Sequence, residues 1–81
     1  MKHNLKVLPE YFKALWCGDK TFEIRKNDRN FQERDEVILE ELGDDGIYTG
    51  RSVEGFIRYL TDFEQKPGYV VFSVEVKLRT E

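Results

Sequence analysis

The segment Gly18–Arg25 holds the densest cluster of side chains that could bind a polar ligand. Lys20, Glu23 and Arg25 bring an ammonium, a carboxylate and a guanidinium within six residues. Glu23 and Arg25 are two positions apart, so in a strand their side chains leave the same face about 7 Å apart. Such a patch can hold a phosphate or a planar polar group. The same charges also fit a solvated, salt-bridged strand face, so the spacing alone leaves both interpretations open.

Four further side chains, outside this cluster, suit a nucleic-acid ligand. Lys26 and Arg29 lie in or beside the predicted turn Asn27–Asn30, where they could contact phosphates. Trp16 and Tyr69 carry rings on which bases could stack. The helical spacing of Trp16 also fits packing against a core, and the two basic residues also fit simple exposure to solvent.

Cys17 and His3 are the only cysteine and the only histidine of the chain. With one cysteine and one histidine, the chain can form neither an intramolecular disulfide nor a zinc site of four Cys or His ligands. Cys17 lies at the C-terminus of a predicted helix, where the helix dipole disfavours the thiolate that a nucleophile needs. We therefore interpret both residues as structural or incidental, and we expect no metal and no cofactor.

The elements that must position these side chains belong to a small chain. Its 81 residues and 9.7 kDa predict a single domain over residues 1–81, with a thin core because a chain of this size buries only about 60–65% of its unfolded surface. No apolar run approaches the ~20 residues of a membrane helix. The first residues lack the pattern of a signal peptide. These features predict a cytoplasmic protein that does not contact a membrane.

Charge is distributed unevenly along the chain. Residues 1–30 contain seven Lys or Arg and four Asp or Glu, a net charge of +3, whereas residues 31–81 contain six and twelve, a net charge of −6. The basic first third suggests an anionic partner, and the acidic remainder would keep its contacts few.

Hydrophobic periodicity predicts five strands and one helix, with four of the strands after the helix. Apolar residues at helical spacing, a proline suited to the first turn and Gly18 as a cap predict a helix over residues 9–17. Alternating residues predict strands over 3–8, 21–26, 36–42, 53–61 and 70–78, with a bend or bulge at Gly55. Together they predict a mainly β fold, a small antiparallel barrel of five strands with one short helix. We expect its core to include Leu15, Phe22, Ile24, Val70, Phe72 and Val74.

The charged cluster also carries a family resemblance. Gly18-x-Lys20-x-x-Glu23-x-Arg25 resembles the G-x-K-x-x-E-x-R signature of ASCH domains, a branch of the PUA-like barrels, with all four positions at the right spacing. Over nearly the whole chain, a compact ASCH-like subfamily of bacteria and phages, without an assigned function, is more similar. The segments that carry this wider resemblance are Leu5–Phe12, Thr21–Arg29, Tyr48–Arg51 and Lys66–Val71.

The resemblance implies a small barrel with a cleft beside the helix, lined by Lys20, Glu23 and Arg25. It also implies RNA binding, the role usually proposed for ASCH domains. Some small bacterial members resemble amidohydrolases that act on acylated cytidine with the signature lysine and a threonine nucleophile. This chain has Glu23 at the position of that threonine, and its nearest hydroxyl, Thr21, lies two residues earlier, so the nucleophile is not matched.

Three functions therefore follow as expectations. The first is binding of RNA, or of a nucleoside or nucleotide, in the cleft. The second is a small hydrolase of a modified nucleoside, with Lys20 as the base and Thr21 and Glu23 nearby. The third is a protein-interaction module of phage or bacterial origin that uses an acidic hairpin, and the sequence leaves the oligomeric state open. For the first function the expected ligand-binding residues are Trp16, Lys20, Glu23, Arg25, Lys26, Arg29 and Tyr69.

Overall fold

A computed structural model describes residues 1–81 as five strands and one short helix. The expected mainly β fold is thereby confirmed. The helix is neither long nor apolar enough to cross a membrane. In chain order the elements are β1 (Lys2–Val7), α1 (Pro9–Cys17), β2 (Phe22–Lys26), β3 (Glu36–Leu42), β4 (Tyr48–Thr61) and β5 (Tyr69–Thr80).

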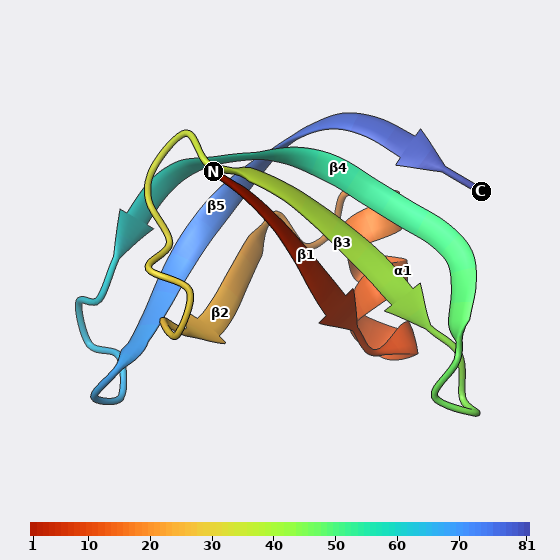
Figure 1. The fold of residues 1–81 in the computed structure, drawn as a ribbon, viewed down its shortest axis with the longest axis horizontal. Coiled ribbons are helices and arrows are strands. Elements are labelled where there is room, and N and C mark those ends of the chain that lie inside the picture. Colours follow the sequence, from red (N-terminus) through yellow and green to blue (C-terminus); the bar gives the residue numbers. More distant parts are fainter.

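The five strands form one sheet in the order β1-β3-β4-β5-β2. The long strands β4 and β5 curve, so that the sheet forms a half-barrel with α1 beneath its arch (Figure 1). Three strand pairs are antiparallel, but β1 and β3 run parallel. The expected antiparallel barrel differs from the structure in two details, because the sheet is mixed and its edge strands β1 and β2 do not pair with each other.

The parallel pair follows from the length of chain between its two strands. Parallel neighbours need a crossover connection of about a dozen residues or more, and residues 8–35, which include α1 and β2, supply it here. Alternation of apolar residues reports which side chains share a face, but it does not report strand direction.

Helix α1 begins and ends where local chemistry predicts. Pro9 occupies the first turn, where its missing N–H breaks no bond. Gly18 adopts the left-handed conformation, with φ 84°, and its N–H donates to the Leu15 carbonyl at 3.2 Å. Phe12 and Leu15 are buried against the sheet, so the helix covers part of the concave side and fixes the start of β2.

The apolar core lies on the concave side of the arch. The expected core residues Leu15, Val70, Phe72 and Val74 are confirmed. The full set of buried hydrophobic residues is Leu5, Val7, Phe12, Leu15, Phe31, Val37, Leu39, Val53, Ile57, Val70, Phe72 and Val74.

Strand β2 faces the opposite way from the sequence-based expectation. Phe22 and Ile24, expected in the core, are 43% and 54% exposed, whereas Glu23 is buried. The alternation was correct, but the assignment of its two faces was wrong. A carboxylate can be buried when other groups hydrogen-bond to it and balance its charge. The neighbours of Glu23 do both, as the site below shows.

Gly55 allows β4 to curve, as expected from the sequence. The register between β4 and β5 shifts between Glu54 and Gly55. A Cβ atom on Gly55 would overlap the backbone carbonyl of Glu75 on β5. The close approach of two backbones therefore requires glycine at this position. β4 and β5 also extend beyond the expected ranges 53–61 and 70–78.

Candidate functional site

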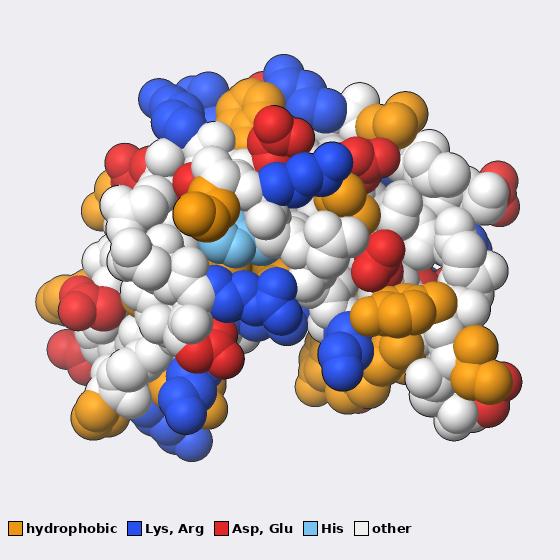
Figure 2. Space-filling view, viewed as in Figure 1, with side chains coloured by type: hydrophobic (Ala, Val, Ile, Leu, Met, Phe, Trp, Pro, Cys, Tyr) orange, Lys and Arg blue, Asp and Glu red, His pale blue; other side chains and the backbone are white.

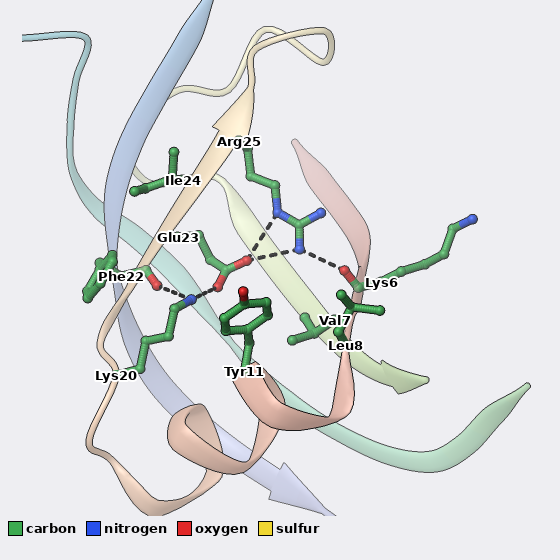
Figure 3. A pocket seen from close by; sticks show the side chains of 9 residues that line it. All are labelled: Lys6, Val7, Leu8, Tyr11, Lys20, Phe22, Glu23, Ile24 and Arg25. Atoms are coloured by element: carbon green, nitrogen blue, oxygen red, sulfur yellow. Dashed lines mark hydrogen bonds and ion pairs between the residues drawn. The ribbon is translucent and has the colours of Figure 1, made fainter. Parts of the chain in front are cut away.

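A cleft opens between the end of β1, the start of α1 and strand β2. Its volume is about 550 Å³, within the range of roughly 300–1,000 Å³ typical of small-molecule sites. Figure 2 shows the molecule hollowed between these elements, with Lys and Arg side chains beside the hollow. Nine residues line the cleft, namely Lys6, Val7, Leu8, Tyr11, Lys20, Phe22, Glu23, Ile24 and Arg25 (Figure 3).

Glu23 lies at the centre of the polar part of this cleft. Its side chain is 5% exposed, and its two oxygens are held by different cations (Figure 3). Lys20 Nζ donates to Oε2, while Arg25 donates to Oε1 from Nε at 3.1 Å and from Nη2 at 2.9 Å. The three charges thus form one compact group with a net charge of +1.

Both cations also bind backbone carbonyls. Lys20 Nζ donates to the carbonyl of Phe22 at 2.8 Å, and Arg25 Nη2 donates to that of Lys6 on β1 at 2.8 Å. The second contact connects the two edge strands across the open side of the half-barrel. Because the other donors of the Arg25 guanidinium bind Glu23, the contact with the Lys6 carbonyl also fixes the position of this group.

Aromatic rings form part of the cleft wall around Lys20. Its Nζ lies 5.9 Å from the ring centre of Tyr11 and 5.0 Å from that of Phe22. Both distances allow attraction between the ammonium and the rings. Tyr11, on α1, is half exposed, so part of its ring and its hydroxyl remain available to a ligand.

The expected cluster of Lys20, Glu23 and Arg25 is therefore brought together on one face. Thr21, the nearest hydroxyl to the signature, is exposed and does not line the cleft. The Glu23 oxygens accept hydrogen bonds from the two neighbouring cations.

The other four expected ligand-binding residues lie outside the cleft lining. Lys26 and Tyr69 are exposed partners in the register of β2 and β5. Arg29 Nη1 donates to the carbonyl of Asn4 on β1 at 2.8 Å, a second contact across the open side. Trp16 packs against the core, where its ring lies 4.4 Å from the Arg51 guanidinium.

Sequence reasoning missed the residues that β1 and α1 contribute to the cleft. Tyr11 belongs to the apolar stripe of α1, whose spacing indicates packing, and Lys6 contributes one charge to the basic first third of the chain. Val7 and Leu8 also line the cleft. The only available signal was a tyrosine in that stripe, because a phenol often keeps its hydroxyl near water.

A separate buried polar cluster surrounds Asp35, which precedes β3. Its Oδ2 lies 2.8 Å from His3 Nε2 and accepts from the backbone N–H of Gln32 at 3.0 Å, while Oδ1 lies 3.3 Å from the amino group of Met1. Burial by itself raises the pKa of Asp35, but these hydrogen bonds and the positive amino group outweigh it and lower the pKa below the ordinary value. His3 thus pairs with Asp35, and Cys17 is exposed at the end of α1.

The amino-acid sequence places this chain in a domain family of unknown function. Residues 2–74 match the domain of unknown function DUF3850, and the chain belongs to this family. It is similar to an uncharacterised 12.9 kDa protein in the GpA 3′ region of Escherichia phage P2, with 42% identity over 60 residues. The match covers 74% of this chain and 54% of the phage protein, so the chain spans about half the length of that relative. The expectation of a phage-related family of unknown function is confirmed.

Proposed function

We propose that this protein binds a nucleoside or nucleotide unit, free or within RNA, in the cleft between β1, α1 and β2. The observation that carries the proposal is the orientation of β2, whose buried and exposed faces are the opposite of those expected from its sequence. A strand placed for stability alone would turn Phe22 and Ile24 toward the core. This strand instead exposes them and turns Glu23 and Arg25 inward.

A buried charged group is a poor source of stability. Removing charges from water is costly, and replacing a buried ion pair with apolar residues is often neutral or stabilising. A charged group on the concave face of such a small sheet is therefore poorly explained as a structural brace. Departures from local stability rules of this kind are expected at functional sites.

The cleft combines features that suit a nucleotide. Tyr11 offers a ring face for stacking, Val7 and Leu8 offer an apolar wall, and Lys20 and Arg25 offer N–H donors. The ASCH resemblance of the Gly18–Arg25 segment agrees with this ligand class. The basic first third of the chain agrees with it as well.

The hydrolase function receives less support from the same geometry. A general base must accept a proton, whereas Lys20 Nζ is a hydrogen-bond donor to both of its protein partners, Glu23 and the Phe22 carbonyl. Thr21, the nearest hydroxyl to the signature, does not line the cleft.

NMR titration of isotope-labelled protein tests the proposal. Nucleoside monophosphates and a mixed-sequence single-stranded RNA should shift the backbone amides of residues 6–8, 11 and 20–25. The RNA should bind more weakly as salt is raised, with a shallow dependence because few phosphates are contacted. Absence of shifts in the cleft would contradict the proposal. Shifts confined to the acidic hairpin around Asp44 and Asp45 would instead indicate a different function.

A further inference from the structure

Resting on the proposed function, we infer that the cleft selects a ligand with a phosphate group, a nucleotide rather than a neutral nucleoside. Some hydrogen-bonding groups of the cleft remain free once the protein has made its own contacts. These groups determine whether the ligand must supply acceptors or donors.

The hydrogen-bond acceptors of the polar wall are already engaged. Each carboxylate oxygen of Glu23 accepts from a cation, and little of this side chain is exposed. The backbone carbonyls of Phe22 and Lys6 accept from Lys20 and Arg25. The amino and hydroxyl donors of a neutral nucleoside would therefore find few partners on this wall.

Hydrogen-bond donors, in contrast, remain free. Arg25 uses Nε and Nη2 for its contacts, which leaves both N–H groups of Nη1 without a protein partner. Figure 3 shows Nη1 turned away from Glu23. Lys20 Nζ donates to two acceptors and carries three hydrogens. The side chains of Lys20 and Arg25 are 19% and 26% exposed, so both are accessible to a ligand.

The charge of the cleft favours the same ligand. The residues that line the cleft include three cations, Lys6, Lys20 and Arg25, and one acidic residue, Glu23, which gives the lining a net charge of +2. A phosphate monoester supplies a charge of about −1.5 to −2 and three strong acceptor oxygens. Arginine and lysine donors form their strongest hydrogen bonds with such an anion.

The test compares each of the four ribonucleosides with its 5′-monophosphate, and with inorganic phosphate, by NMR titration of the full chain. The monophosphates should shift the cleft amides with a Kd at least tenfold below that of the matching nucleoside, about 1.4 kcal/mol. A single-stranded RNA without terminal phosphates shows whether an internal phosphate is also accepted, and binding at the same amides would agree with the inference.

Two variants assign any phosphate effect to the cleft. In Arg25→Ala, the ratio of nucleoside Kd to monophosphate Kd should fall toward one. Arg58→Ala removes the same charge from the outer face, where Arg58 pairs with Glu75 at 3.2 Å, and should retain the ratio. Melting curves of both variants serve as the control for folding.

The outcomes separate this inference from the proposed function. Nucleosides that bind the cleft as tightly as their monophosphates would overturn the inference and leave the proposed function standing. Inorganic phosphate that binds as tightly as the monophosphates would overturn the proposed function, because the nucleoside would contribute nothing. Absence of any effect at the cleft amides would overturn both.

Discussion

The guanidinium of Arg25 on β2 donates a 2.8 Å hydrogen bond to the backbone carbonyl of Lys6 on β1. These are the two edge strands of the sheet, which do not pair with each other. The Arg25 side chain therefore connects two strands that no backbone hydrogen bonds join, and it also lines the cleft. Arg29, bound to the Asn4 carbonyl, repeats the contact outside the cleft, so the two roles can be tested separately.

Arg29→Ala should loosen β1 without affecting ligand binding. The variant loses one exposed hydrogen bond to backbone, which we expect to lower the free energy of unfolding by about 0.5–1 kcal/mol. Hydrogen exchange at the β1 amides should become faster, and Lys26→Ala serves as a neighbouring control. Unchanged exchange in β1 would contradict a role of Arg29 in connecting the edge strands.

Phe72→Ala and Phe22→Ala test the facing of the strands. Phe72 is 1% exposed, and its truncation should destabilise the fold by ~3–5 kcal/mol because it leaves a cavity. Phe22 is 43% exposed and lies outside the core, so its truncation should change stability by no more than ~0.5–1 kcal/mol. Urea denaturation measures both. Similar losses for the two variants would show that Phe22 is in the core.

Strand alternation was predictable from the sequence, but its orientation in β2 was not. Phe22 and Ile24 form the more apolar face of this strand, so a rule that buries apolar residues assigns them to the core. The actual orientation depends on Lys20 and Arg25, which balance Glu23, and the Lys6 carbonyl that Arg25 binds lies nineteen positions away in sequence. Local patterns cannot reveal such a long-range partner.

Helix α1 and Gly55 illustrate what local chemistry does predict. The helix bounds depend on Pro9 and Gly18, whose preferences act within one turn, and they match the structure. The cluster of Lys20, Glu23 and Arg25 was also predictable, because the three residues are neighbours in the sequence. Tyr11 and Lys6 lie at the cleft because of the crossover connection from β1 to β3. The alternation of apolar and polar residues does not report this connection.

Acid should destabilise the protein partly through Asp35. Its pKa is below the ordinary 3.8 in the folded state, so the folded form binds its proton only at lower pH than the unfolded chain. The stabilisation is therefore complete above about pH 3.8 and is lost as pH falls through the folded-state pKa. Urea denaturation of the wild type and Asp35→Asn across this range should show that the variant is less stable at neutral pH and that the difference narrows in acid. A constant difference would contradict this role of Asp35.

Gly55→Ala should be among the more destabilising single-methyl changes in the chain. The added Cβ would overlap the Glu75 carbonyl, and relieving the clash requires separation of β4 from β5, at a cost of about 1–3 kcal/mol or more. Ser52→Ala, in the same strand, serves as the control and should change stability little. A Gly55→Ala variant that melts like the wild type would mean that β4 does not bend against β5 as described.

The measurement that tests the central claim most directly compares Lys20→Ala with Lys77→Ala. Both lysines pair with a glutamate, and their Nζ atoms lie 5.0 Å and 4.9 Å from the ring centres of Phe22 and Phe56. Only Lys20 lines the cleft. Thermal melting should show a larger fall in Tm for Lys20→Ala than for Lys77→Ala, because Glu23 is more buried than Glu75, with both variants still folded. Nucleoside monophosphate titration should show at least a tenfold loss of affinity only in Lys20→Ala. A large loss of stability in Lys20→Ala with unchanged nucleotide binding would show that the charged group is a structural brace.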